Sequence, residues 1–324
     1  MKVILAIDGG GSRTRCLAID ESGQTLSTVE TGASNHLLVE RETVVRSLSE
    51  SIENALTQSN LQCADVACVS AGLAGVDYDG AGEEEMKQVL RRLGFNRTVI
   101  NGDMVIAHAG ALAGKPGVMA LAGTGSSILG IGKKGERVKV GGWGPVYGDE
   151  GSAYRIGQMS LRAAARDFDG FDAKTALTEA VKDALGIDDF KETVNLVYVK
   201  GLEIREIAAL SRAAYEVAEA GDVVARKIFL QAGEELAESV ATAIARLSMR
   251  GEAIEVSYQG SVLESCSLVR ESFIKGLTQR EPQAEIVPPK YTPVIGAYLL
   301  GRASLGLQTD ERNLRTLNEQ NEEK

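Results

Sequence analysis

The chain opens with three short apolar runs separated by glycine-containing turns. They predict strands over residues 2–7, 14–20 and 24–31. From residue 40 the apolar positions recur every four residues, which is the spacing of an amphipathic helix over 40–58. Strands are then predicted at 66–70 and 97–101, and helices at 81–93 and 104–113. The order β-β-β-α-β-α-β-α predicts an α/β domain.

The same pattern starts again after the cluster Gly114-Lys115-Pro116-Gly117. Strands are predicted at 118–122, 128–131 and 137–140. An offset of 123 − 11 = 112 residues places Gly11 on Gly123 and the turn residue Gly23 on Gly135. We interpret this as an internal repeat of a glycine-turn hairpin unit, and therefore expect two similar domains that each present such a turn.

The second half of the chain is more helical. Helical spacing covers residues 151–168, 173–186, 190–199, 204–220 and 222–249, followed by a strand at 254–259, a helix near 264–279, a strand at 284–287 and a last helix at 293–306. We expect residues 1–115 to form one domain, joined by the helix 292–308. Residues 116–291 form the second domain, with a helical insertion, and the polar tail 309–324 is expected to fray.

Composition and charge narrow the classes of function. The formal charge is 35 − 45 = −10, which disfavours nonspecific binding to nucleic acid. No apolar segment approaches the length that crosses a bilayer, and Asp8 interrupts the first apolar run too early for a signal peptide. The four cysteines form no C-x-x-C pair, and the two histidines have no partner at metal-ligand spacing. We therefore expect a cytoplasmic protein that binds neither membranes nor nucleic acid.

The first candidate site is the turn Asp8-Gly9-Gly10-Gly11-Ser12 after the first strand. Glycines let a backbone approach a large ligand closely, and the N–H groups of such a turn favour anions. A carboxylate beside a phosphate requires a cation such as Mg²⁺ between them. A plain hairpin is the alternative, but the matching turn Gly123-Thr124-Gly125 favours two phosphate-binding turns.

Asp103 follows a predicted strand and precedes a helix. Open α/β sheets place ligand-binding residues at the carboxyl ends of their strands, although an N-cap is an equally good interpretation. Opposite two phosphate turns, this carboxylate would suit a general base that takes the proton of an attacking sugar hydroxyl.

The segment 141–152 contains five glycines within its first eleven residues, the single tryptophan Trp143, and the acidic pair Asp149-Glu150. Because it cannot build a helix or a regular strand, we expect a shaped loop that binds a polyol. The alternatives are core packing for Trp143 and favourable charge at a helix start for the two acids. Asn35-His36, after the third strand, is either a ligand-binding pair or an ordinary cap, and Gly260-Ser261 forms another strand-to-helix turn.

These stretches together resemble the N-acetylglucosamine kinase family, in the BadF-type ATPase group of the sugar kinase, actin and Hsp70 superfamily. The segment Gly148–Tyr154, with Gly142-Trp143-Gly144 before it, is the most specific part of the resemblance. It implies two repeated ribonuclease H-like domains around a central cleft, that is, the actin-like ATPase or sugar kinase fold. The implied activity is ATP-dependent phosphorylation of the 6-hydroxyl of an amino sugar.

The resemblance also implies roles for particular residues. Asp103 matches the catalytic base, and Asp8 matches an acidic residue that serves Mg²⁺ through water. ATP would be bound by Gly10, Gly11, Ser12, Thr14, Gly123, Thr124, Gly125, Ala209, Gly260 and Ser261. The sugar would be bound by Asn35, His36, Gly142, Trp143, Asp149 and Ala153. A homodimer is implied, whereas glucosamine, N-acetylglucosamine and N-acetylmuramic acid all remain open as the substrate.

Two other functions remain alternatives. An activator ATPase of the BadF type would share a [4Fe–4S] cluster between two subunits, but Cys63 and Cys68 are spaced C-x₄-C and Cys68 falls in a predicted strand. A sugar-sensing protein without turnover would be expected to lack the base, and Asp103 is present.

Overall fold

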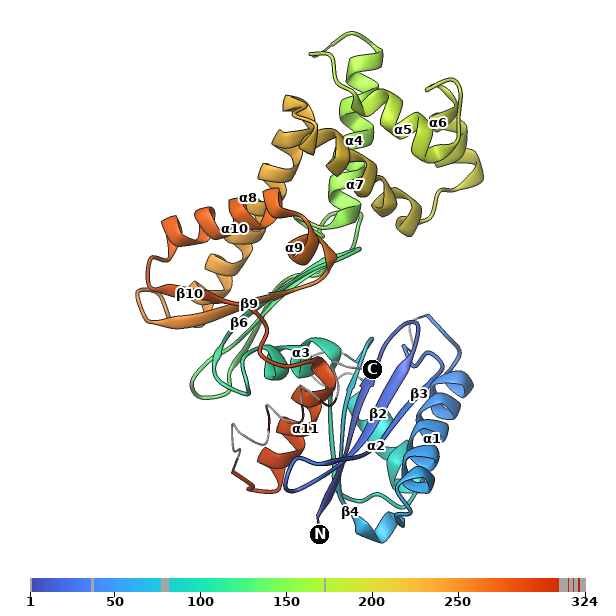
Figure 1. The fold of residues 1–324 in the computed structure, drawn as a ribbon, viewed down its shortest axis with the longest axis vertical. Coiled ribbons are helices and arrows are strands. Elements are labelled where there is room, and N and C mark those ends of the chain that lie inside the picture. Colours follow the sequence, from blue (N-terminus) through green and yellow to red (C-terminus); the bar gives the residue numbers. More distant parts are fainter. Residues whose placement is uncertain are drawn as a thin grey trace. The chain divides into compact units, whose positions relative to one another are not determined.

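The computed structural model describes residues 2–35, 38–76, 82–171 and 173–308, together with Leu314, Leu317 and Gln320. The chain divides into two compact units (Figure 1). The N-terminal unit comprises residues 1–115 and 288–324, and the C-terminal unit comprises residues 116–287. Each unit has one five-stranded sheet, and we describe each by itself.

The sheet of the N-terminal unit has the order β3-β2-β1-β4-β5. Its strands are β1 (Val3–Gly9), β2 (Thr14–Asp20), β3 (Thr25–Thr31), β4 (Val66–Leu73) and β5 (Thr98–Gly102). β1, β2 and β3 form an antiparallel meander, whereas β4 and β5 add in parallel on the other side of β1. This arrangement follows from the sequence, because four-residue turns join the first three strands and helices join the others.

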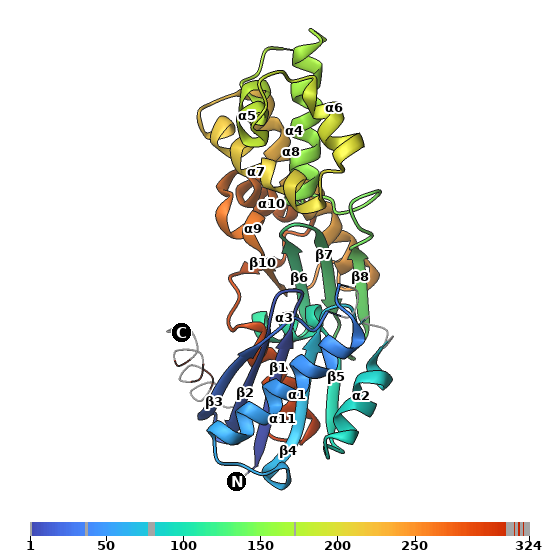
Figure 2. The ribbon, with the colours of Figure 1, turned by 90° about the vertical axis from the view of Figure 1, so that its right-hand side faces the viewer.

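Side chains that alternate along β1 belong to two different apolar layers, one on each face of the sheet. Val3, Leu5 and Ile7 face helices α1 (Arg41–Gln58) and α2 (Glu83–Arg92). Ile4 and Ala6 face the opposite layer, which contains α11 (Pro293–Ser304) packed beside α3 (Asp103–Ala111). Figure 2 shows α1 in front of this sheet and α11 behind it. Asp8 continues the Ile4 and Ala6 side of β1, because side chains alternate along a strand.

The sheet of the C-terminal unit repeats this plan, with the order β8-β7-β6-β9-β10. Its strands are β6 (Gly117–Ala122), β7 (Ser126–Ile131), β8 (Arg137–Gly141), β9 (Ile254–Gln259) and β10 (Ala284–Val287). The first three are again antiparallel and the last two parallel. The two sheets therefore confirm the repeat that the glycine turns predict.

Helices between β8 and β9 enlarge the C-terminal unit. They are α4 (Ala153–Phe168), α5 (Leu177–Leu185), α6 (Glu192–Asn195), α7 (Ile204–Glu219) and α8 (Val223–Arg246). A π-helical turn, η2 (Leu196–Lys200), follows α6, so the helix expected over 190–199 changes its hydrogen bonding midway. After β9, the single helix expected near 264–279 is two, α9 (Ser261–Ser265) and α10 (Ser267–Arg280), because Cys266 has an extended backbone.

The tail differs from the expectation of a frayed polar segment. Leu314 and Leu317 are 2% and 0% exposed and belong to the apolar cluster between β1, β2 and α11. The side chain of Gln320 accepts a hydrogen bond from the Thr25 amide at 3.4 Å. Two leucines three residues apart share one side of a helical turn, so they can pack on the sheet although their neighbours in the sequence are charged.

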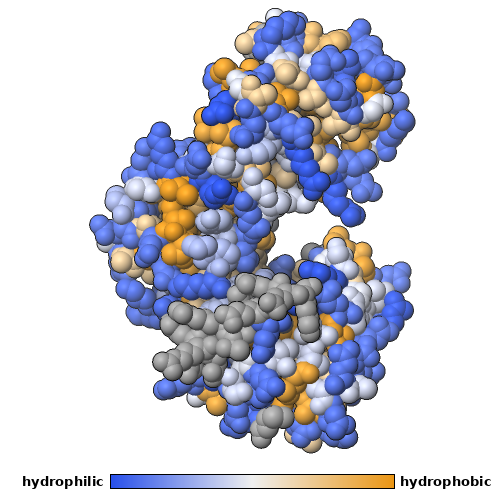
Figure 3. All heavy atoms as spheres, viewed as in Figure 1, coloured by the Kyte–Doolittle hydropathy of each residue, from blue (hydrophilic) through white to orange (hydrophobic). Residues whose placement is uncertain are grey.

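Hydrophilic residues predominate on the face of the molecule drawn in Figure 3. Within the part of the chain that the structure describes, no helix is long and apolar enough to cross a membrane.

Candidate functional site

The first glycine turn joins β1 to β2 and is held by backbone hydrogen bonds. The Gly10 amide donates to the Arg13 carbonyl oxygen at 2.9 Å, and the Gly10 carbonyl oxygen accepts from the Ser34 amide at 3.0 Å. A Cβ atom on Gly9 would lie 2.3 Å from Ser34 Oγ, so only glycine fits there. The loop that carries Asn35 is thus fixed against the turn, while His36 lies outside the described residues.

Thr14, expected to bind ATP, has another task in the structure. Its side chain is fully buried, and its hydroxyl lies 2.8 Å from both the Gly32 carbonyl oxygen and Ser34 Oγ. The Thr14 hydroxyl therefore ties the start of β2 to the end of β3. Ser12, in contrast, is exposed at the tip of the turn, where a ligand can reach its hydroxyl.

Asp8 and Asp103 are the two acidic residues of the candidate site in the N-terminal unit. Asp8 is the second-last residue of β1, and Asp103 is the first residue of α3, directly after β5. Burial raises the pKa of Asp8 from 3.8 to about 6, and the nearby Asp103 carboxylate adds to this rise, whereas Arg13 and Arg15 oppose it. The structure thus brings together the two carboxylates that the sequence places at the ends of two parallel strands.

The alternative of an N-cap at Asp103 does not match the structure. Gly102 occupies the N-cap position of α3, and no side chain caps it. The Asp103 Oδ1 atom accepts a hydrogen bond from the Met104 amide at 2.8 Å, which fixes the orientation of the carboxylate at the start of the helix. This position at the N-terminal end of a helix favours the ionised form of a carboxylate.

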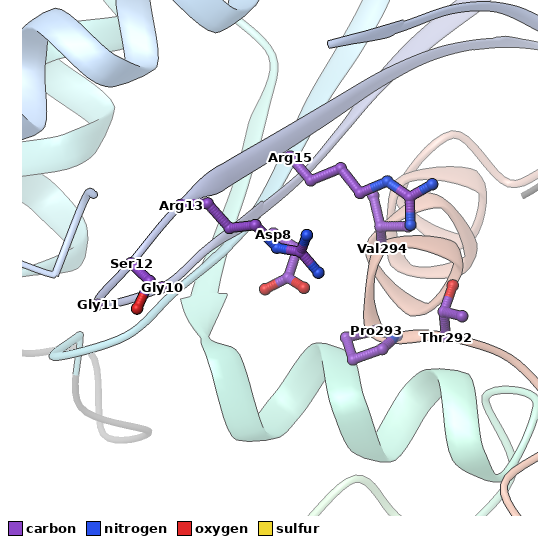
Figure 4. Close-up of a pocket in the computed structure, with 9 residues that line it drawn as sticks. All are labelled: Asp8, Gly10, Gly11, Ser12, Arg13, Arg15, Thr292, Pro293 and Val294. Atoms are coloured by element: carbon purple, nitrogen blue, oxygen red, sulfur yellow. The ribbon is translucent and has the colours of Figure 1, made fainter. Parts of the chain in front are cut away.

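A pocket of about 380 Å³ opens beside Asp8 in the N-terminal unit (Figure 4). The first glycine turn forms one wall, and the N-terminus of α11, at Thr292, Pro293 and Val294, forms the other. Figure 4 shows the Arg13 guanidinium over the Asp8 carboxylate, and the Arg15 guanidinium directed toward Val294. Arg13, Arg15 and Thr292 are not among the residues predicted from the sequence. Arg15 lies in β2 opposite Asp8, and Arg13 precedes it by two residues at the end of the turn, so this spacing was the available signal.

The second glycine turn, Gly123-Thr124-Gly125, joins β6 to β7 and contacts the start of α4. The carbonyl oxygens of Gly123 and Thr124 accept from the amides of Ala153 and Tyr154, at 2.9 and 3.1 Å. Ala153 is itself buried. The first amides of α4 are therefore satisfied by the turn, and the helix holds the turn in place.

Asp149, expected to bind the sugar, lies beneath this turn. It is 6% exposed, its φ is +58°, and its carboxylate oxygen lies 3.0 Å from where a Cβ atom on Gly125 would be. Burial raises the pKa of this carboxyl, whereas hydrogen bonds from the Ser126 and Gly144 amides lower it. These contacts indicate that Asp149 links the glycine-rich loop to the second turn.

The glycine-rich loop exposes its aromatic residues. Trp143 is 67% exposed, so core packing, the alternative for this residue, is wrong. Its ring stacks on Tyr147 with centroids 6.4 Å apart. Gly142 has a φ of +70°, and a Cβ atom there would lie 2.8 Å from Ser127 Oγ. The loop can therefore offer an exposed aromatic surface, while its backbone at Gly142 packs closely on Ser127.

The remaining predicted ATP residues divide into two groups. Gly260 packs tightly on the strand before the second turn, since its φ is +100° and a Cβ atom would lie 2.4 Å from the Ala122 carbonyl oxygen. The structure therefore brings Gly260 and the exposed Ser261 next to the second turn. Ala209 is exposed on α7, and no described contact links it to this turn.

The site was also tested for a metal ion. No group of three or more histidine, cysteine or acidic residues among the described residues could hold one. Mg²⁺ in phosphoryl-transfer sites uses one or two carboxylates and completes its shell with phosphate oxygens and water. Asp8, with Asp103 close to it, fits that donor set.

Comparisons with known proteins support the same reading. A model of the BadF/BadG/BcrA/BcrD ATPase family matches residues 5–301. The chain is 31% identical over 304 residues to the N-acetylmuramic acid/N-acetylglucosamine kinase of Clostridium acetobutylicum, covering 94% of this chain and 99% of that one. It is 28% identical to the N-acetyl-D-glucosamine kinase of Dictyostelium discoideum, covering 92% and 97%.

One solved structure has a similar fold along most of its length. It is a candidate N-acetylglucosamine kinase from Chromobacterium violaceum, with a TM-score of 0.70 and 25% identity. The match covers 93% of this chain and 98% of that one. The two-unit α/β architecture is therefore shared with this protein.

Proposed function

Because the chain belongs to the BadF/BadG/BcrA/BcrD ATPase family, we propose that it is an ATP-dependent kinase of amino sugars. The acceptor is the 6-hydroxyl of N-acetylglucosamine, glucosamine or N-acetylmuramic acid. The observation that carries this proposal is the pairing of Asp8 with Asp103 beside the first glycine turn. Phosphoryl transfer requires a base for the acceptor, neutralised charge and positioned phosphates. Asp103 supplies the base, and Asp8 contributes to neutralisation only by holding a cation next to the phosphates.

Asp103 is the proposed base. It accepts the proton of the sugar 6-hydroxyl while the hydroxyl oxygen forms a bond to the γ-phosphorus of ATP, and the bond from that phosphorus to the β,γ-bridging oxygen breaks. The products are the sugar 6-phosphate and ADP. The hydrogen bond from the Met104 amide keeps the carboxylate oriented during this step. Mg²⁺, when bound, supplies positive charge next to the phosphates, and Asp8 would hold it, directly or through water.

The other residues bind and orient the two substrates. The backbone of Gly10, Gly11 and Ser12 and that of Gly123, Thr124 and Gly125 bind phosphates, and Gly260 and Ser261 bind the adenosine, with Ala209 as a further candidate. Asn35 and the segment Gly142-Trp143 contact the sugar, and His36 is a candidate beside Asn35. Asp149 and Ala153 support this binding by fixing the second turn.

A coupled ADP-release assay tests the proposal directly. The substrates to compare are glucose, glucosamine, N-acetylglucosamine and N-acetylmuramic acid. We expect ADP release with at least one amino sugar and none with its 6-deoxy analogue. ADP release with the 6-deoxy analogue would contradict the assignment of the 6-hydroxyl.

The variant Asp103→Asn tests the base. We expect kcat to fall by about 10²–10⁴, the usual contribution of a general base, while ADP still binds. Asp183→Asn, an exposed carboxylate on α5, is the matched control and should leave kcat unchanged. Near-normal kcat in Asp103→Asn would refute the mechanism.

The activator alternative is disfavoured by the position of Cys68. This cysteine is buried in β4, with Sγ 3.6 Å from Ser304 Oγ on α11. Its thiol therefore faces the core of the unit and cannot be shared with a second subunit. An iron–sulfur absorption band after anaerobic purification would overturn the kinase proposal.

The family resemblance further supports a homodimer and a cytoplasmic location. Sedimentation velocity of the purified chain and fractionation of the source cells test these two expectations.

A further inference from the structure

A row of charged side chains crosses the sheet of the N-terminal unit next to the first turn. The strand register places Asp8 opposite Arg15, and Arg15 opposite Glu30. The Arg15 Nε atom lies 3.8 Å from a Glu30 carboxylate oxygen, and the Arg15 side chain is 17% exposed. Because residues directly opposite share a face, this row continues the α11 face of the sheet beyond its apolar core.

The pocket of Figure 4 lies between this row and the start of α11. Thr292 occupies the N-cap position of α11, but its side chain makes no capping hydrogen bond. Its Oγ1 atom is buried and has no hydrogen-bond partner among the residues that the structure describes. Pro293 follows at the first helical position. The positive end of a twelve-residue helix and an unused hydroxyl thus face the same pocket as two guanidinium groups.

The charges of the site require such cations. Asp8 and Asp103 repel any anion that approaches the first turn, and one divalent cation offsets only these two carboxylates. A nucleotide polyphosphate would then still be the largest negative charge in the site. Arginine is the side chain best suited to this task, because its planar donors bind phosphate oxygens in pairs and it stays charged at every working pH.

We propose that Arg13 and Arg15 bind the terminal phosphates of the nucleotide from the α11 side of the first turn, with the Thr292 hydroxyl as a further donor. This inference rests on the proposed function, which places phosphates at that turn. It adds two positioning residues that neutralise charge without a metal. Both arginines contribute to nucleotide binding itself. When EDTA removes divalent cations, the remaining affinity for the nucleotide should therefore depend on these two side chains.

A purely structural role for Arg13 accounts for little. Its ion pair with Glu30 has a distance of 3.3 Å, and the two side chains are 68% and 46% exposed. Exposed pairs of this kind contribute little to stability, because water screens their attraction. Replacing Arg13 should therefore leave the fold intact.

The test is calorimetric titration of the full chain with ADP and with adenosine, each in excess EDTA and again with Mg²⁺. The variants are Arg13→Met, Arg15→Met and Arg15→Lys. Arg46→Met, an exposed arginine on α1 of the same unit, is the matched control. We expect Arg13→Met and Arg15→Met each to weaken ADP binding at least tenfold in EDTA, with adenosine binding unchanged. Arg15→Lys should recover part of the loss, and added salt should weaken ADP binding less in the variants than in the wild type.

The inference is overturned if Arg13→Met and Arg15→Met bind ADP in EDTA as tightly as Arg46→Met does. If Arg15→Met fails to fold, the exposed Arg13 decides the matter by itself. The two failures are distinguishable. Sugar phosphorylation by the wild type with unaltered ADP affinity in both variants refutes only the arginine inference. Arginine-dependent ADP binding without sugar phosphorylation refutes only the proposed function.

Discussion

The crossing of α3 and α11 gives the sharpest quantitative prediction, through Gly296→Ala. A Cβ atom on Gly296 would lie 1.9 Å from the Ile106 carbonyl oxygen and 2.5 Å from the Gly110 amide nitrogen. Real Cβ atoms do not approach other atoms closer than 3.0 Å, so the helices must separate by about 3.0 − 1.9 = 1.1 Å. Both contacts are backbone atoms, and no rotamer change can relieve them.

The cost follows from the size of this clash. Overpacking of a core costs about 1–3 kcal/mol and sometimes more, whereas alanine gains about 1 kcal/mol over glycine in a helix. Because the clash is with backbone atoms that cannot turn aside, we take the upper end of this cost, about 3 kcal/mol, and expect a net loss of about 3 − 1 = 2 kcal/mol for Gly296→Ala. In a unit of about 150 residues this lowers the Tm by roughly 4–8 °C. Since α3 begins with Asp103 and α11 begins beside the pocket, kcat should also fall.

Differential scanning calorimetry of the full chain measures this effect, and Gly276→Ala is its matched control. Gly276 lies inside α10, where a Cβ atom would meet the end of the Glu234 side chain at 2.2 Å. That carboxylate can swing away, so the helix propensity of alanine should dominate and the Tm should hold or rise. A Gly296→Ala protein that melts at or above the wild-type temperature would refute the reasoning.

Three further predictions concern single side chains. The raised pKa of Asp8 means that its contribution to stability is present below about pH 4 and is lost as the pH rises through about 6. Asp8→Asn should therefore melt higher than the wild type at pH 7 but not at pH 4, and an equal difference at both pH values in a thermal-shift assay would contradict this. Asp149→Ala should loosen the loop that carries Trp143, the single tryptophan, and lower its fluorescence anisotropy; an unchanged anisotropy would contradict the linking role. Tyr298→Phe removes a buried hydrogen bond of 2.8 Å to the Asp20 carbonyl oxygen. The free energy of unfolding measured by urea denaturation should fall by about 1–2 kcal/mol. An unchanged urea midpoint would contradict this prediction.

Much of the fold could be predicted from periodicity and turn residues. The period-2 runs and the glycine turns place the meander strands to within about two residues, and β2 begins and ends where expected. The family match confirms the resemblance that rests on these stretches. The break at Cys266 could not be predicted, because the apolar spacing continues through it.

The candidate site was predictable only in part. Motif position makes Asp8 and Asp103 candidates, since Asp8 lies among the last residues of β1, next to the turn, and Asp103 directly follows β5. Sequence does not tell whether a hydroxyl in a turn faces a ligand or the protein. Thr14 was assigned to ATP, but its burial against Ser34 depends on a residue twenty positions away. Thr292 could not be predicted for the same reason, because it lines the pocket only through the packing of α11 on the sheet.

The two repeated hairpins differ in the charge of the side chains next to their turns. The first turn is one residue longer than the second, so the strand register aligns Asp8 with Leu121 before the turn and Arg15 with Ser127 after it. The row Asp8–Arg15–Glu30 in the N-terminal unit thus corresponds to the uncharged row Leu121–Ser127–Gly141 in the C-terminal unit.

The same backbone therefore carries charge in one unit and none in the other. The second turn has an uncharged strand row beside it and the anionic Asp149 beneath it, so its own groups that can bind phosphate are its amides and the hydroxyl of Thr124. Removing that hydroxyl should then weaken ADP binding less than removing the Arg13 guanidinium, because the guanidinium brings a full positive charge and paired donors to the phosphate, whereas the hydroxyl brings one neutral donor. We therefore expect the N-terminal unit to supply the charged groups of phosphoryl transfer, and the C-terminal turn, held by α4 and Asp149, to supply a fixed backbone.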